Sequence, residues 1–200
     1  MSFVRNTLSS MAAGAILTLG AAHAEEPVSA KTITEALKPK PLTRSLAGPT
    51  GMSVEQTQFV DQLRRKTRAI TVVERKKLAA IVADGDLPAI DLEILFDYNS
   101  SAITRDAMPH LLQLSLALRD DALRNSTFLL GGHTDAMGDD AYNQRLSEER
   151  AQSAKDFLVK NFNIDSYQLI AVGYGEEQLK NSADPNAAEN RRVQIVNVTR

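Results

Sequence analysis

The hydrophobic positions after residue 88 follow two different periods. In the first strand-like run, apolar and polar residues alternate, so that Ile90, Leu92 and Ile94 share one face. In two longer segments the apolar residues recur at helical spacing. The strand-like runs cover 90–96, 127–130, 169–172 and 193–198, and the helical segments cover 104–119 and 139–162. This order predicts an α/β fold of the α+β sandwich type, with a mixed sheet of about four strands and helices packed on one face.

The chain before this domain has a different character. Prolines interrupt residues 25–52, which show no helical or alternating stripe and are interpreted as a linker. Residues 53–56 and 71–74 each fit a capping box, so helices are expected over about 54–68 and 72–83, the second with an apolar face at 78, 81 and 82. The predicted division is a linker at 25–52, a helical extension at 53–84 and a domain at 88–200. The basic residues expected on exposed faces of the extension are Arg64, Arg65, Lys66, Arg68, Arg75, Lys76 and Lys77.

Residues 1–24 have the layout of a secretory signal peptide. Arg5 precedes an apolar run, and Ala22-His23-Ala24 forms the small-residue pattern of a cleavage site. The alternative is a membrane anchor, but the run from Met11 to Ala22 is shorter than the roughly 20 residues that span a bilayer. Cleavage after Ala24 is therefore expected, leaving an exported chain with no membrane span.

The composition narrows the range of functions. Lys and Arg total 23 against 25 Asp and Glu, a balance that argues against nucleic-acid binding. The chain has no Cys, which excludes disulfides, thiol nucleophiles, Cys-ligated metals and the lipidated cysteine of a lipoprotein. Together with the signal peptide, this predicts an unlipidated periplasmic protein.

Patterns typical of catalysis or metal binding are missing from the sequence. There is no G-x-S-x-G elbow, and the glycine pairs near 131 and 173 do not form a phosphate-binding loop. The acids at 135, 139 and 140 lack calcium-loop spacing, and His133-x-Asp135 offers only two ligands. No enzymatic activity, metal or cofactor is therefore expected.

Two charged residues instead indicate a binding site. Asp135 follows the apolar strand over 127–130, and Arg150 shares a helix face with Leu146, Ala154 and Phe157 that should turn toward the sheet. Asn143 lies on the same stripe, two turns earlier. Because an Arg side chain stays charged, Arg150 must meet a carboxylate, a bound anion or a polar cleft.

Two interpretations of this pair remain open. Asp135 and Arg150 could form an internal salt bridge that only fixes strand to helix. Alternatively, both groups border a pocket in which the Asp accepts an ammonium and the Arg holds a carboxylate, each through charge-assisted bonds worth roughly 1.5–3 kcal/mol. The second arrangement would select a zwitterionic, amino-acid-like group over a neutral sugar.

Several motifs in order give the chain a specific resemblance. Over about 90–198 it resembles the OmpA C-terminal-like (OmpA/MotB-type) peptidoglycan-binding domain family. The motifs that carry the resemblance are Phe96-Asp-x-Asn99-Ser100, Gly132-His-Thr-Asp135-x-x-Gly138, Tyr142-Asn143-x-x-Leu146-Ser147-x-x-Arg150-Ala151, Gly173-Tyr-Gly-Glu176 and Asn190-Arg191-Arg192-Val193. The segment before 84 is too short for the outer-membrane barrel of that family.

The resemblance implies non-covalent binding of diaminopimelate in the peptide stems of peptidoglycan, whose free end is the zwitterion described above. By motif position, Asp135 resembles the ammonium acceptor and Arg150 the carboxylate clamp. Asn99 and Asn143 resemble polar pocket walls, and Arg191 a further contributor. The alternatives are an internal helix–loop bond for Asn143 and a purely solubilising role for Arg191. His133 is not a ligand in the family pattern and is interpreted as a packed structural residue.

These observations leave three hypotheses of different classes. The first is a non-catalytic periplasmic protein that binds peptidoglycan and anchors or organises the envelope, associated with the cell wall or the outer membrane. The second is an envelope adaptor whose extension at 53–84 binds a membrane or protein partner, with wall binding serving only localisation. The third, a wall hydrolase, would need an acid–base pair or a metal-activated water that the sequence does not offer.

Overall fold

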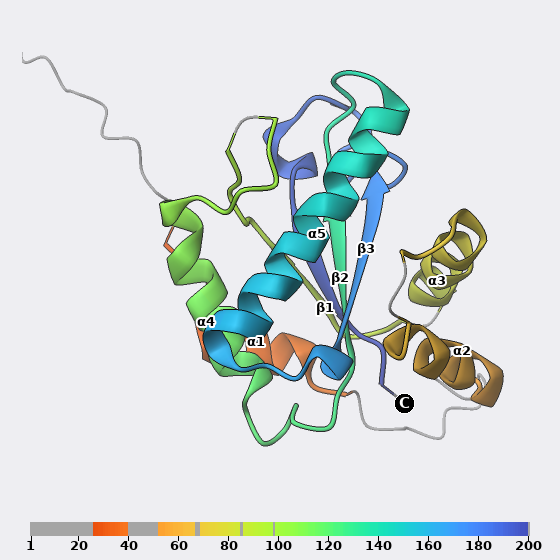
Figure 1. The fold of residues 1–200 in the computed structure, drawn as a ribbon, viewed down its shortest axis with the longest axis vertical. Helices are drawn as coiled ribbons and strands as arrows, with labels where there is room; N and C mark the ends of the chain where they lie inside the picture. Colours follow the sequence, from red (N-terminus) through yellow and green to blue (C-terminus); the bar gives the residue numbers. More distant parts are fainter. Residues whose placement is uncertain (1–25, 40–51, 67–68, 85, 98, 200) are drawn as a thin grey trace, which may run out of the picture.

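The computed structural model describes residues 26–39, 52–66, 69–84, 86–97 and 99–199 (Figure 1). The predicted signal peptide and most of the predicted linker lie outside these residues. Among the described helices, none is both long and apolar enough to cross a membrane. The elements in chain order are α1 Ala30–Leu37, α2 Val54–Arg64, α3 Val72–Asp84, β1 Ala89–Leu92, the 3-10 helix η1 Arg105–Ala107, α4 Met108–Leu118, β2 Phe128–His133, α5 Asp140–Phe162, η2 Ser166–Gln168, β3 Leu169–Gly175, η3 Ala188–Asn190 and β4 Val193–Asn197.

The four strands form one mixed sheet in the order β1-β4-β2-β3. β2 and β3 are parallel and are joined through α5, as parallel neighbours require a crossover connection. β4 runs antiparallel to both β1 and β2, with Ile195 paired to Ile90 on one side and to Leu130 on the other. The predicted fold class is confirmed, and each predicted strand and helix of the domain is present with modest shifts at its ends.

One face of the sheet is covered by α1, α4 and α5. Its core includes Phe128 and Leu130 of β2, and the predicted inward face of the first strand is confirmed by Leu92 and Ile94, which are 2% and 4% exposed. Alternate residues of a strand point to opposite faces, so Leu129 and Val196 point away from this core. They require a second cover.

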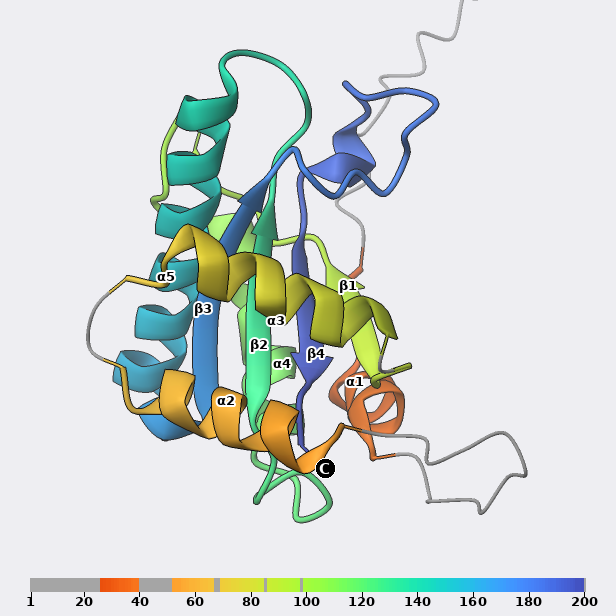
Figure 2. The ribbon, with the colours of Figure 1, turned by 90° about the vertical axis from the view of Figure 1, so that its right-hand side faces the viewer.

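The helical extension supplies that cover. α2 and α3 lie across the opposite face of the sheet, as Figure 2 shows, and bury Leu63 and Leu78 against Leu129, Ile170 and Val196. The prediction of helices on one face therefore holds for the domain itself, and the extension adds a third layer. The apolar run of β2 carries the signal for this layer, since a strand covered on both faces shows no alternation.

Part of the predicted linker is a helix, so that prediction is wrong for residues 30–37. α1 begins after the N-cap Ser29, and Ile33 and Leu37 are fully buried against α4 and the sheet. The side chain of Asn197 donates to the carbonyl of Leu37 at 2.8 Å. A helix of two turns shows only one pair of apolar residues at i and i+4, which is too short a pattern to distinguish from a loop.

Both predicted capping boxes are present. The Ser53 and Gln56 side chains exchange hydrogen bonds with each other's backbone N–H groups, and Thr71 and Glu74 do the same. One prediction for the extension is wrong: Arg75 is not exposed but 8% accessible, lying between α3 and the sheet with its Nη2 3.2 Å from Glu177. The aliphatic stem of an Arg can fill an apolar interface while its head reaches a carboxylate at the edge.

His133 ends β2 on the second face and is only 2% exposed, which confirms the packed position predicted for it. Its ring stacks on that of Tyr174 in β3, with ring centroids 5.3 Å apart. Burial, assisted by the positive charge of Arg192, lowers the pKa of His133 from 6.5 to about 3. The imidazole is therefore neutral in the folded protein at any pH above this value.

We expect Leu78→Ala to lower the free energy of unfolding by about 2–5 kcal/mol, because it removes a fully buried side chain between α3 and the sheet. Urea denaturation followed by circular dichroism measures this loss. Val73→Ala, on the exposed side of the same helix, is the matched control and should change stability by less than about 0.5 kcal/mol. An unchanged midpoint for Leu78→Ala would mean that α3 does not contribute to the folded unit.

Stability should fall with acidification because of His133. Its folded pKa lies below its unfolded value of 6.5, so the unfolded chain takes up a proton that the folded protein rejects, and stability is lost from about pH 6.5 down toward pH 3. Between pH 7 and pH 5 we expect a loss of about 2 kcal/mol. His133→Phe, which keeps a stacking ring, should remove this loss, whereas His110→Gln should retain it. A pH dependence that survives His133→Phe would assign the loss to other groups.

Candidate functional site

The site forms where β2 ends and α5 begins, beside the loop that leads into β4. Asp135 lies two residues after the end of β2, and Asp139 caps α5 by accepting a hydrogen bond from the N–H of Tyr142 at 3.1 Å. The carbonyl of Pro185 in the long loop before β4 accepts from the N–H of Ala136 at 3.0 Å. Two loops that are distant in sequence are thus joined next to Asp135.

Two glycines set the distance between α5 and the sheet. A Cβ atom on Gly132 would lie 2.2 Å from the carbonyl oxygen of Ser147, and one on Gly173 would lie 2.3 Å from the N–H nitrogen of Glu148. The Ser147 hydroxyl uses this closeness to accept a hydrogen bond from the N–H of Gly175 at 2.8 Å. The first half of α5 is therefore held against the ends of β2 and β3, and Arg150 is held with it.

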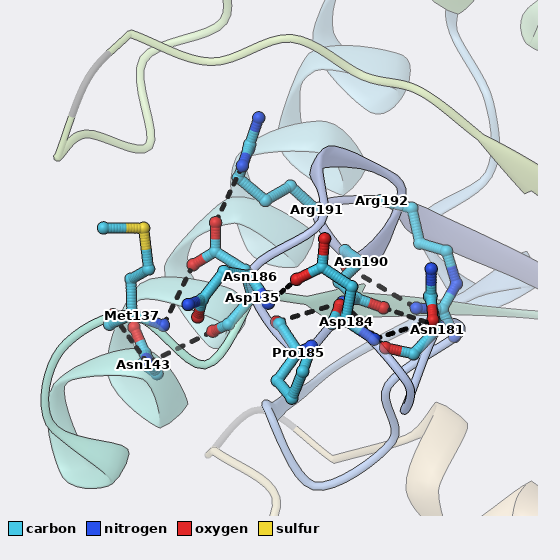
Figure 3. Close-up of polar contacts among 10 residues, drawn as sticks. All are labelled: Asp135, Met137, Asn143, Asn181, Asp184, Pro185, Asn186, Asn190, Arg191 and Arg192. Carbon is cyan, nitrogen blue, oxygen red and sulfur yellow. Dashed lines mark hydrogen bonds and ion pairs between the residues drawn. The ribbon is translucent and has the colours of Figure 1, made fainter.

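The carboxylate of Asp135 is already paired (Figure 3). Its Oδ2 lies 2.7 Å from Nη1 of Arg191, and its Oδ1 accepts from the N–H of Met137 at 3.3 Å. The residue is 8% exposed. The ion pair joins residues 56 positions apart, across the two loops described above.

Arg150 lies on the inward side of α5, as its position on the helix stripe predicts. Its Nε donates to the carbonyl of Ser100 at 3.0 Å, and its guanidinium lies over the ring of Phe96, 5.1 Å from the centroid. Desolvation lowers its pKa, although an Arg remains charged throughout the physiological range. No carboxylate of the described residues lies within 4.0 Å of it, so the internal Asp135–Arg150 salt bridge is not formed.

A small cavity of about 80 Å³ opens beside Arg150. Arg191, Arg192, Glu93 and Phe96 also line it. Arg191 is paired with Asp135 and Arg192 with Asp91, so Arg150 is the lining arginine that has no carboxylate partner among the described residues. An unpaired guanidinium at a cavity suits a carboxylate group. A larger groove of about 830 Å³ between α2 and α5 includes neither Asp135 nor Arg150. Asp135 does not line the small cavity either, but its ion-pair partner Arg191 does, so the carboxylate lies behind that arginine.

Asn143 realises the alternative interpretation, an internal helix–loop bond. It is 2% exposed, and its Nδ2 donates to Glu176 at 2.6 Å and to the carbonyls of Met137 and Asp135 at 3.1 and 3.3 Å. This amide fixes the backbone of the loop that carries Asp135. Asn143 therefore supports the site by holding this loop in place. It is not among the residues that line the cavity.

Asn99 lies in the turn after Phe96, close in sequence to the carbonyl that holds Arg150. Its φ is 50°, a left-handed conformation that Asn tolerates better than most residues, and it is exposed. The turn is closed by hydrogen bonds between Asp97 and Ser100 and between Asp97 and Ala102, both at 3.1 Å. Asn99 is not among the described residues that line the cavity.

One residue that sequence reasoning missed organises the loop before β4. Asn190 is fully buried, and its Nδ2 donates to the carbonyls of Asn181, Asp184 and Pro185 at 3.3, 3.1 and 3.0 Å (Figure 3). Its Oδ1 accepts from the N–H of Asn181 at 2.8 Å. The sequence signal for this role was its position in the motif Asn190-Arg191-Arg192-Val193. A buried Asn amide can donate to several carbonyls and so fix the shape of a loop.

Metal binding has no support in this part of the molecule. His133 points to the α3 face of the sheet, where it stacks on Tyr174, and Asp135 is paired with Arg191. Within the described ranges, no group of three His, Asp or Glu side chains is arranged to hold an ion.

The segment that carries this site is similar in sequence to known proteins. Residues 95–192, which include all five predicted site residues, match the model of the OmpA family. The chain is 32% identical over 114 residues to outer membrane porin F of Pseudomonas aeruginosa, covering 56% of this chain and 32% of that protein. It is 39% identical over 84 residues to outer membrane protein A of Serratia marcescens, covering 42% of this chain and 23% of that protein.

The matched region is thus about a third or less of these curated relatives. Among solved structures, the peptidoglycan-associated lipoprotein from Burkholderia pseudomallei aligns with a TM-score of 0.44 at 26% identity, over 52% of this chain and 87% of that one. The family match and the ordered motifs agree on the same segment. Residues 95–192 of this chain are therefore a domain of the OmpA family, as the motifs predicted.

Proposed function

We propose that this protein binds peptidoglycan without catalysing a reaction and anchors or organises the cell envelope. The observation that carries the proposal is Arg150, a partly desolvated guanidinium with no carboxylate partner among the described side chains, which lines a small cavity together with Arg191, the ion-pair partner of Asp135. A charged group held this way is stabilised by an anionic ligand. Family membership makes peptidoglycan the polymer that supplies it.

The ligand group is the free end of diaminopimelate in the peptide stems. Its carboxylate binds Arg150, and its ammonium binds Asp135. Each charge-assisted hydrogen bond contributes roughly 1.5–3 kcal/mol. Asn143 and Asn99 act on the site through the loops that they shape, and Arg191 acts on it through its ion pair with Asp135.

The setting of the domain follows from the same proposal. The signal peptide predicted at 1–24 and the absence of Cys support an unlipidated protein in the periplasm, associated with the wall or the outer membrane. The adaptor alternative has less support, because α2 and α3 use their apolar faces to cover the sheet and leave only their outer faces for a partner. The extension is better explained as part of the wall-binding unit.

Arg150→Ala and Asp135→Ala should each reduce co-sedimentation with diaminopimelate-type sacculi by about ten-fold or more, the loss expected for one charge-assisted interaction. The fraction of protein in the pellet across a range of sacculus concentrations measures this. Arg145→Ala is the matched control, since it removes the same charge from an exposed position of the same helix. If the double variant pelleted as well as the wild type, the assignment of Asp135 and Arg150 would be wrong.

Sacculi incubated with the protein should release no soluble muropeptides above the level of a buffer blank. Chromatography of the supernatant tests this, because neither an acid–base pair nor a metal-activated water was identified at the site. Release that increases with protein concentration would contradict a purely binding function.

A further inference from the structure

The ion pair between Arg191 and Asp135 occupies the position that the proposed ligand needs. Asp135 has two carboxylate oxygens: the backbone N–H of Met137 bonds to Oδ1, and the guanidinium of Arg191 bonds to Oδ2. Only 11% of the Asp135 side chain is exposed, against 47% of the Arg191 side chain. Arg191 therefore covers the acid from the solvent side.

Because Arg191 bonds to Oδ2 and covers it from the solvent side, an incoming ammonium competes with Arg191 for this oxygen. The loop backbone need not move with it, because the neighbouring Asn190 is clamped by three carbonyls and the carbonyl of Arg192 accepts from the N–H of His133 at 3.0 Å. The half-exposed side chain of Arg191 is free to rotate into solvent about a fixed main chain. Ligand binding would then exchange one cation for another at the same carboxylate.

We propose that Arg191 is an internal counter-ion of Asp135 that competes with the ammonium of the ligand, and so sets the specificity of the site for cationic groups. This inference rests on the proposed function and changes the role expected for Arg191 from contributor to competitor. A hydroxyl group of a sugar cannot replace Arg191, because it would leave the buried Asp135 charge without a counter-ion. Only a group that carries its own positive charge can do so.

Arg150 differs from Arg191 in its ion pairing, so the two arginines are expected to have different roles in binding. It makes no ion pair with a described carboxylate, and its nearest charged neighbours include both Asp135 and Arg191, which act on its pKa in opposite directions. When Arg191 leaves Asp135, the ammonium of the ligand takes its place at that acid. The carboxylate of the same ligand then binds Arg150. The zwitterion thus replaces the ion pair between Arg191 and Asp135, and it supplies Arg150 with a carboxylate partner.

The test compares two ligands that differ only in their amino groups. Binding of meso-diaminopimelate and of pimelate, the same dicarboxylate without ammonium groups, is measured by NMR titration of the full chain. Arg191→Gln should tighten diaminopimelate binding about three- to five-fold, the range of a partly exposed ion pair, and should not tighten pimelate binding. Arg119→Gln, which removes an exposed charge outside the site, should change neither.

Weaker or unchanged diaminopimelate binding by Arg191→Gln would overturn the inference, weaker binding by showing that Arg191 contacts the ligand directly. The Nε–H resonance of Arg191 in the wild-type protein gives an independent readout: it should shift on addition of diaminopimelate and stay in place with pimelate. The proposed function fails separately, if Asp135→Ala and Arg150→Ala leave diaminopimelate binding intact.

Discussion

The close approach of α5 to the sheet is the constraint on which the rest of the site depends. The helix can rest on β2 and β3 only because Gly132 and Gly173 lack side chains, since a Cβ atom on either would overlap the backbone of the helix. The same contact lets Ser147 accept a hydrogen bond from the N–H of Gly175. It holds Arg150 in a fixed position beside the strand ends. A longer distance between α5 and the sheet would open the small cavity to water and weaken the electrostatic interactions within it.

Long periodic segments could be predicted from the sequence because they carry many repeats of one pattern. The strands and the helices α4 and α5 are of this kind. α1 was missed because two turns show a single apolar pair, Ile33 and Leu37, among prolines that suggest a loop. The layer formed by α2 and α3 was missed for another reason. Their helical nature was visible, and the apolar run of β2 indicated a strand covered on both faces, but the full surface that receives them, which also includes Val196 of β4, can be recognised only once the strands are aligned.

The predicted site shows a similar division. A strand end and a helix face were enough to bring Asp135 and Arg150 to one region, since both positions follow from periodicity. Their partners did not follow, because Arg191 reaches Asp135 through a long loop whose shape is fixed by Asn190. Asn143 shows the same limit: its place on the helix stripe was predictable, whereas its bonds to Glu176 and to two loop carbonyls depend on how the loops close.

The proposed role of Asp135 as acceptor of a cationic ligand requires that the carboxylate also have a partner when no ligand is bound. Asp135 is nearly covered, and an unpaired carboxylate in such a place would cost several kcal/mol of stability. The fold meets this requirement with a guanidinium from a well-anchored loop, but one whose side chain is half exposed, so the pair is weak enough to be exchanged. A fully buried partner would make the domain more stable and would close the site to its ligand. Folding and binding therefore draw on the same carboxylate, and the exposure of Arg191 sets the balance between them.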